Sequence, residues 1–251
     1  MTIEIKNGVV VFLDALGISD YETTAQYLDF ICELKKLKIK TDYVWKKWQI
    51  QFKNEKILLP KPDIVTFQDS IIICFPEPKD KERTLHYFFA AGQWLTQVVC
   101  LAIEKRIFLR GSVSVGEYIF DTSSDNVSVM GKPISEAHKC EKIAEWIGVI
   151  QTPTFKTQYE NVLETLATEQ KRSKNDLIDE YRFLFSPYPV PLKKGGTHEY
   201  FVVSWPQLVY HHKEELDKLA SILLETSRLV DPKHEPKYVN TLAFLKNFKG
   251  K

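Results

Sequence analysis

The segment 8–14, GVVVFLD, constrains the fold most, because it is almost wholly apolar, rich in β-branched residues and closed by an acid. Such a run predicts a strand that is buried on both of its faces. The segment 63–75, DIVTFQDSIIICF, predicts two further strands joined by a tight turn around Asp69. The chain is therefore expected to fold around a sheet in which Asp14 and Asp69 stand at strand ends.

Helical and β patterns alternate along the first 153 residues. They predict helices over 19–36, 82–106 and 133–145, strands over 107–120 and 146–151, and a polar loop over 121–128. The resulting order, β-α-β-β-α-β-loop-α-β, is typical of an α+β fold of the ferredoxin-like βαββαβ type. Such a fold has a mixed or antiparallel sheet, and we expect its helices on one face.

Beyond residue 153 the patterns are weaker. They predict helices over 159–167, 216–229 and 238–248, a strand over 199–204, and a loop punctuated by Pro and Gly over 182–196. We expect residues 1–153 to form the core domain, in which 35–62 is a connecting segment or flap. Residues 154–251 are expected to form a C-terminal extension, with a strand and helices packed on that core.

The composition excludes several classes of protein. The chain has 251 residues, 44% of them hydrophobic, and a formal net charge of +1, so no global field draws it to nucleic acid or to a membrane. No apolar run approaches the ~20 residues that a membrane span needs, and the N-terminus lacks the layout of a signal peptide. The four cysteines are scattered without a CxxC pair, which indicates reduced thiols in a cytoplasmic protein.

Asp14 and Asp69 are the candidate metal ligands. In a ferredoxin-like sheet their strands are neighbours, so both carboxylates should reach the same edge, and no His or Cys accompanies them. Such a pair suits a hard, oxygen-preferring ion such as Mg²⁺ or Mn²⁺. An Asp at a strand end is also commonly a turn residue or a helix cap, and this alternative stays open.

The loop after Asp14 is a candidate phosphate site. Residues Leu16, Gly17, Ile18 and Ser19 lead into the first predicted helix. Backbone N–H groups at a helix N-terminus attract phosphate oxygens. The acid, the short loop and the helix start together indicate a site for a metal and a triphosphate.

Four motifs in this order resemble those of class III nucleotidyl cyclases. VVVFLDALG resembles the first metal strand, and TFQDSIIICF resembles the second metal hairpin, with Gln68 where the family usually has Gly. LRGSVSVGEY and VMGKPISEAHKCEKIAEWIGVIQTP resemble the strand and the helix that follow in the family. The motifs cover residues 9–153, and the rest of the chain matches no motif of the family.

The resemblance implies a two-metal reaction. Asp14 and Asp69, with the carbonyl oxygen of Ala15, would hold two Mn²⁺ or Mg²⁺ ions per site. One ion would activate the ribose 3′-hydroxyl for in-line attack on the α-phosphate, and the other would bind the leaving pyrophosphate.

The resemblance also implies residues that stabilise the transition state. Arg110, and Lys139 at the position of the family's Arg, would offset charge on the α-phosphate. Ser135 stands where the family has Asn. In the family the site forms between two subunits, which implies a head-to-tail homodimer.

Two positions depart from the family's purine codes. Val65 stands where adenylyl enzymes have Lys and guanylyl enzymes have Glu, and Ser128 falls near the second base-reading position. An unpaired polar base edge is costly to bury, so this pocket should not favour adenine or guanine in the usual way. The departures resemble the pyrimidine cyclases of bacterial Pycsar antiphage systems. This resemblance implies synthesis of cyclic UMP or cyclic CMP from UTP or CTP, and a product that acts on a separate effector.

Three alternatives remain. A purine cyclase would keep the same metal acids, and a catalytically inactive nucleotide-binding protein is suggested by Ser135 and Lys139. A nucleic-acid-binding module is suggested by the basic and aromatic segment 35–56, although the near-zero net charge argues against it.

Overall fold

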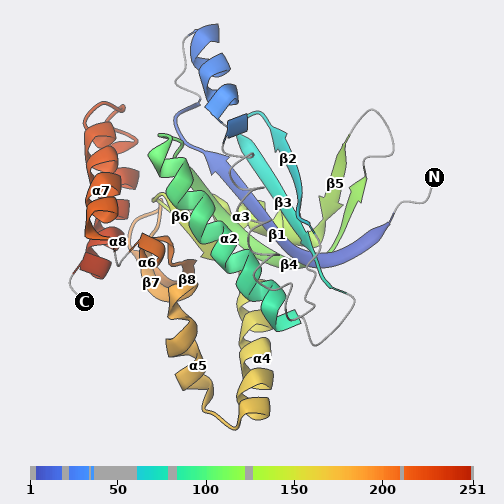
Figure 1. Cartoon of the computed structure of the whole chain (residues 1–251). Helices are drawn as coiled ribbons and strands as arrows, with labels where there is room; N and C mark the ends of the chain where they lie inside the picture. Colours follow the sequence, from blue (N-terminus) through green and yellow to red (C-terminus); the bar gives the residue numbers. More distant parts are fainter. Residues whose placement is uncertain are drawn as a thin grey trace.

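One mixed sheet organises the molecule (Figure 1). The computed structural model describes residues 4–18, 23–33, 35–36, 61–78, 84–121, 127–209 and 212–249. Within these residues the sheet has eight strands in the order β2-β3-β1-β4-β6-β8-β7, with β5 paired to β4 off that path. The strands are β1 (Ile5–Ala15), β2 (Asp63–Phe67), β3 (Ser70–Pro76), β4 (Leu109–Asp121), β5 (Ser128–Gly131), β6 (Gly148–Gln151), β7 (Phe185–Pro191) and β8 (Thr197–Val203).

The helices lie on both faces of this sheet and at its β7 end. They are α2 (Thr84–Glu104), α3 (Lys132–Glu141), α4 (Pro153–Gln170), α5 (Lys174–Glu180), α6 (Trp205–Val209), α7 (Lys213–Ser227) and α8 (Glu235–Lys249), with further helical residues at 24–33 and 35–36. The α+β class is as predicted, and so is the order of elements over the first 153 residues apart from the additional strand β5. Ser19 and residues 37–60, which make up most of the expected flap, lie outside the described residues.

Strand β1 is central and buried on both faces, as its sequence predicts. It pairs antiparallel with β3 and with β4. Val9, Val11 and Leu13 are fully buried in the main core beneath α2. Val10 faces the opposite side, where it packs in a small cluster with Cys74 and Tyr118.

Helix α3 lies on the face opposite α2, so the expectation that the helices share one face is wrong. Helix α3 packs on this face because β4 presents serine hydroxyls there that form hydrogen bonds with the helix. Ser112 Oγ donates to the Ala137 carbonyl at 2.5 Å, and Ser114 Oγ donates to Glu136 Oε2 at 2.6 Å. Strand periodicity alone does not reveal that a polar face is covered.

The C-terminal residues extend the same sheet. Strand β6 runs parallel to β4, and β8 pairs with β6 at Ile150 and Val202. Helix α8 is anchored at Thr241, whose Oγ1 accepts from Ile147 N at 2.8 Å. The prediction of a loop over 182–196 is wrong, because β7 occupies part of it. Its sequence, FSPYPVP, places prolines at alternate positions of an edge strand, where the missing N–H groups need not break a ladder.

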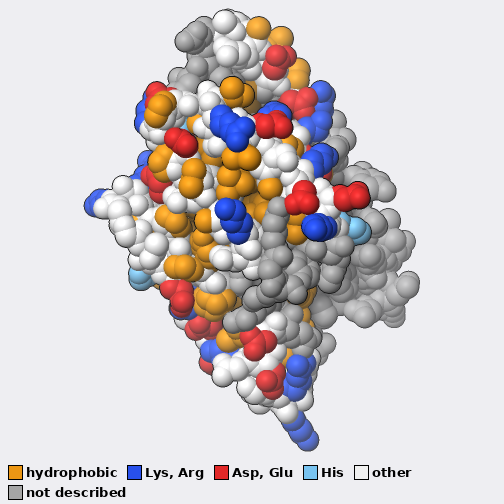
Figure 2. All heavy atoms as spheres, turned by 90° about the vertical axis from the view of Figure 1, so that its left-hand side faces the viewer, with side chains coloured by type: hydrophobic (Ala, Val, Ile, Leu, Met, Phe, Trp, Pro, Cys, Tyr) orange, Lys and Arg blue, Asp and Glu red, His pale blue; other side chains and the backbone are white. Residues whose placement is uncertain are grey.

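Other boundaries also differ from prediction. Helix α4 begins earlier than expected, because Thr152 caps it by accepting from Phe155 N at 3.2 Å and Pro153 fits the first turn. Helix α5 and strand β5 were not predicted, and both are short. The face over α7 and α8 mixes charged and hydrophobic side chains (Figure 2). Leu224 in α7 and Val239 in α8 are among the exposed hydrophobic residues. None of the described helices is long and apolar enough to cross a bilayer.

We expect Gly111→Ala to destabilise the protein. Gly111 faces Leu13 across the β1–β4 ladder, and a Cβ there would lie 2.5 Å from the Phe12 carbonyl oxygen. Overpacking of this kind lowers the free energy of unfolding by about 1–3 kcal/mol, measurable as a lower urea midpoint. Thr197→Ala on an exposed strand position is the control, and equal midpoints for both variants would contradict the expected crowding.

Candidate active site

The structure brings Asp14 and Asp69 to one edge of the sheet. Asp14 lies opposite Ser70 in the β1–β3 ladder, directly beside the turn that contains Asp69. Gln68 closes this turn with a left-handed φ of 53°, and Ala15 N donates to the Asp69 carbonyl at 2.9 Å. Both Asp side chains are partly exposed. The predicted neighbourhood of the two acids is therefore present, on the α3 side of the sheet.

Arg110 lies directly across from Asp14 in the β1–β4 ladder. Its side chain is 8% exposed, and its Nη2 lies 2.9 Å from Asp14 Oδ2. The same nitrogen forms an ion pair with Glu141. Its Nε is buried without a hydrogen-bond partner among the described residues. The Arg110 guanidinium thus lies between the carboxylates of Asp14 and Glu141, and its Nε–H has no acceptor among the described residues.

Glu141 was missed by the sequence analysis. It ends α3, and only 2% of its side chain is exposed. Pro133, Ala137 and Glu141 follow each other at four-residue spacing and form the inward stripe of this helix. The sequence signal for Glu141 was its place on the apolar face of the predicted helix, which would put an acid against a strand that carries Arg110.

The surroundings at this edge shift the pKa values of Asp14 and Glu141. Burial raises the pKa of Asp14; the nearby Arg110 opposes that shift and the Asp69 carboxylate adds to it. Burial likewise raises the pKa of Glu141, against the effect of Arg110. These shifts place the carboxylates in one electrostatic cluster with the guanidinium.

Two lysines of the C-terminal extension lie in the field of this cluster. Lys193, from the turn between β7 and β8, and Lys237, from α8, both have a pKa lowered by burial and then by Arg110. Both also experience the charge of Asp14. Lys237 Nζ lies 3.0 Å from His234 Nδ1. The sequence patterns indicate neither lysine, because no local motif connects Lys193 or Lys237 to Asp14.

His138 is a further neighbour that the sequence analysis missed. Its ring lies against the Phe12 ring with centroids 4.7 Å apart. Burial and then Lys142 lower the pKa of His138, while Asp14 acts to raise it. The His138 ring thus packs on Phe12 and lies within the electrostatic influence of Asp14.

The loop after β1 is partly committed to the protein's own backbone. Ala15 N donates to Asp69, and Leu16 N donates to the Phe108 carbonyl at 2.8 Å. Gly17 adopts a left-handed φ of 85°, and Ile18 is buried. The N–H groups of Ala15 and Leu16 are thus unavailable to a phosphate, and only the later part of the loop could supply donors.

Ser135 and Lys139 lie on the outward face of α3. Both are exposed, and both are half a helical turn away from the inward residue Ala137. The structure therefore does not bring them to the Asp14 of the same chain.

Val65 lies on the α3 face of the sheet, whereas Ser128 lies on the other face, because its neighbour Val129 is the residue that packs on the α3 side. Val65 pairs with Ile72 across the β2–β3 hairpin, and Ser128 precedes Val129 in β5. Ile72 and Val129 both pack against the small cluster around Tyr118. Within one chain, the two expected base-reading positions therefore do not share a face of the sheet.

The donors at this edge fit a hard divalent ion. No group of three or more His, Cys, Asp or Glu side chains that could hold a metal gathers in the described parts of the chain. Asp14 and Asp69 offer two carboxylates whose mutual repulsion a cation would relieve. Mg²⁺ is commonly bound by one or two carboxylates together with substrate phosphates and water, which matches this set.

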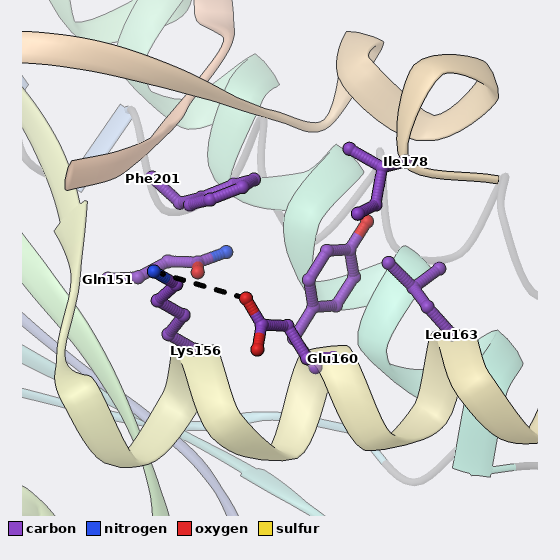
Figure 3. A pocket seen from close by; sticks show the side chains of 7 residues that line it. Gln151, Lys156, Glu160, Leu163, Ile178 and Phe201 are labelled. Atoms are coloured by element: carbon purple, nitrogen blue, oxygen red, sulfur yellow. Dashed lines mark ion pairs between the residues drawn. The ribbon is translucent and has the colours of Figure 1, made fainter. Parts of the chain in front are cut away.

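A polar side chain on the opposite face lies away from this edge. Gln151 in β6 is buried, and its amide atoms lack partners among the described residues. Figure 3 shows it beneath Phe201, beside the rim pair Lys156–Glu160, whose charged atoms lie 3.9 Å apart. The pocket that it lines has no room for a water molecule. The described geometry therefore offers no ligand a place there.

The comparisons with known proteins give structural likeness only. No protein-family model and no curated protein matches the chain. The catalytic core of a rhodopsin-guanylyl cyclase with converted specificity, solved in complex with ATPαS, is 15% identical, with 81% of this chain and 98% of that chain covered and a TM-score of 0.47. The monomeric guanylyl cyclase domain of the RhoGC fusion protein from the aquatic fungus Blastocladiella emersonii is 14% identical over the same shares, with a TM-score of 0.48. Adenylate cyclases from Trypanosoma brucei in their monomeric state give 12% identity, coverage of 80% and 90%, and a TM-score of 0.38. Likeness at this level assigns no activity to the chain.

We expect Asp14 to titrate above the usual pH range of an Asp. Asp69→Asn removes one of the causes that raise its pKa, so the pKa of Asp14 should fall toward its ordinary value. Carbon-detected NMR of the carboxyl groups over a pH series measures this, with Asp14→Asn for assignment. Asp63→Asn, at the far end of the same hairpin, should leave the pKa of Asp14 unchanged. An Asp14 that ignores Asp69→Asn would show that the two acids are not coupled.

Proposed function

We propose that this protein is a divalent-metal-dependent nucleotidyl cyclase that converts UTP or CTP into the 3′,5′-cyclic monophosphate and pyrophosphate. The observation that carries the proposal is the meeting of Asp14 and Asp69 at one sheet edge, with the buried Arg110 beside them. The ordered motifs that resemble class III cyclases support it, because they contain these same three residues. The product would serve as a second messenger for a separate effector, as the resemblance to antiphage cyclases implies.

Each residue at the edge has a defined part in this chemistry. Asp14 and Asp69, together with the Ala15 carbonyl, would hold the metal ions. When bound, these ions lower the pKa of the ribose 3′-hydroxyl and stabilise the leaving pyrophosphate. The guanidinium of Arg110 lies beside Asp14, where its positive charge would offset the negative charge that builds up on the α-phosphate in the transition state.

The lysines of the C-terminal extension complete the electrostatics. Lys193 and Lys237 add positive charge on the same side as Arg110. A triphosphate carries several negative charges, which the two metal ions offset only in part. Lys193 and Lys237 would therefore raise the affinity for the triphosphate without taking part in the bond changes.

The choice of a pyrimidine rests on the residue types at the base-reading positions. Neither Val65 nor Ser128 is charged, so neither supplies the Lys or Glu with which the purine enzymes of the family read their base. Burying a purine edge without its partner is costly, whereas a smaller base presents fewer groups to satisfy. A purine product would contradict this part of the proposal and leave the cyclase assignment intact.

The outward position of Ser135 and Lys139 supports a homodimer. On one chain they point away from Asp14, so they can act only at the site of another copy. A head-to-tail pair of chains would give two sites, each with metal acids from one chain and α3 side chains from the other.

We expect the wild-type protein with Mn²⁺ to yield a cyclic pyrimidine product when it is incubated separately with UTP, CTP, ATP and GTP. Asp14→Asn and Asp69→Asn should each abolish turnover, because each removes a metal ligand and leaves the side-chain volume unchanged. Mass spectrometry identifies the product, and circular dichroism confirms folding. A wild-type protein that binds nucleotide without turning it over would support the inactive alternative instead.

A mixing experiment tests the shared site. Asp14→Asn and Lys139→Ala should each be inactive alone, and their mixture should recover turnover, because a mixed dimer contains one site with both residues intact. The control mixes Asp14→Asn with Asp69→Asn, whose mixed dimers lack a metal acid at both sites and should stay inactive. The absence of recovery in the first mixture would rule out the two-chain arrangement.

A further inference from the structure

Glu141 is the most deeply buried acid of the edge. It lies at the end of the inward stripe of α3, and its residue is 1% exposed. Arg110 is its ion-pair partner, and Asp14 and Lys193 are the other charged groups that act on it. A buried carboxylate is costly unless it is paired, so Glu141 depends on Arg110. Its burial also prevents it from reaching a substrate.

Arg110 is shared between two carboxylates that differ in exposure. The same Nη2 atom serves Asp14 on the neighbouring strand and Glu141 on the helix above. The Asp14 side chain is 23% exposed, whereas that of Glu141 is almost fully enclosed. Glu141 can therefore pair only inside the protein, while Asp14 can still turn an oxygen toward the open edge.

We propose that Glu141 is a positioning residue that shares Nη2 of Arg110 with Asp14, so that the guanidinium holds only Oδ2 of Asp14 and leaves the other carboxylate oxygen available to a divalent ion. This inference rests on the proposed function for the metal, and its geometry comes from the ion pairs alone. Without the charge of Glu141, the guanidinium would settle on Asp14 as its one remaining carboxylate. A guanidinium can bind both oxygens of a carboxylate in a fork, which would compete directly with a metal.

The test measures Mn²⁺ binding without nucleotide. Electron paramagnetic resonance of free Mn²⁺ gives the dissociation constant for the wild type and for Glu141→Gln. We expect the variant to bind Mn²⁺ about tenfold more weakly, because residues that orient metal ligands commonly alter affinity by about 10–100-fold. Glu136→Gln is the matched control, since Glu136 lies on the same helix but bonds Ser114 and Thr154. It should leave the Mn²⁺ affinity close to that of the wild type.

A second background separates positioning from general damage to the fold. In Arg110→Met protein no guanidinium can settle on Asp14, so adding Glu141→Gln should no longer weaken Mn²⁺ binding. Equal Mn²⁺ affinity of the wild type and Glu141→Gln would overturn the positioning role and leave the cyclase proposal standing. An equal loss in both backgrounds would also overturn it, as a structural effect. A wild-type protein that binds no Mn²⁺ and forms no cyclic product would overturn both proposals.

Discussion

The register between β1 and β4 is the constraint on which the rest of the structure depends. It sets Asp14 opposite Arg110 and, at the same time, turns Val9, Val11 and Leu13 toward the core beneath α2. A slip of one residue would move the whole apolar set to the other face and drive Asp14 into the core. The hydrophobic burial that holds this register therefore also fixes the position of the carboxylate.

The buried charges of Arg110 and Glu141 on the α3 face are a poor way to stabilise a fold. Arg110 and Glu141 are almost fully buried, and removing charges from water costs several kcal/mol per ion. Apolar residues of similar size commonly serve a fold as well or better at such positions. The α2 face of the same strands follows that rule without exception at Leu13, Leu109 and Val113. The α3 face thus carries buried charges where the α2 face carries apolar side chains, and the stability of the fold does not explain this difference.

Sequence patterns predicted what depends on local periodicity and missed what depends on distant partners. The strand that ends at Asp14 and the hairpin around Asp69 were predicted, because burial and turn chemistry are written in consecutive residues. Glu141 was missed, because its burial is meaningful only once Arg110 is known to lie beneath it. Strand β7 was missed because its three prolines are typical of a loop, although an edge strand also tolerates them.

Hydrogen bonds dock the C-terminal extension on the end of α3 and on β6, close to the edge that carries Asp14. Strand β8 continues the sheet from β6, and the turn after β7 brings Lys193 to the end of α3, where its N–H donates to the Ile143 carbonyl at 3.0 Å. Thr241 ties α8 to Ile147 at the start of β6, and Lys237 lies one turn earlier on that helix. The contacts that dock the C-terminal extension therefore also fix the positions of Lys193 and Lys237. Local sequence does not indicate where Lys193 and Lys237 lie, because distant contacts place them: a backbone hydrogen bond to Ile143 for Lys193, and the docking of α8 through Thr241 for Lys237.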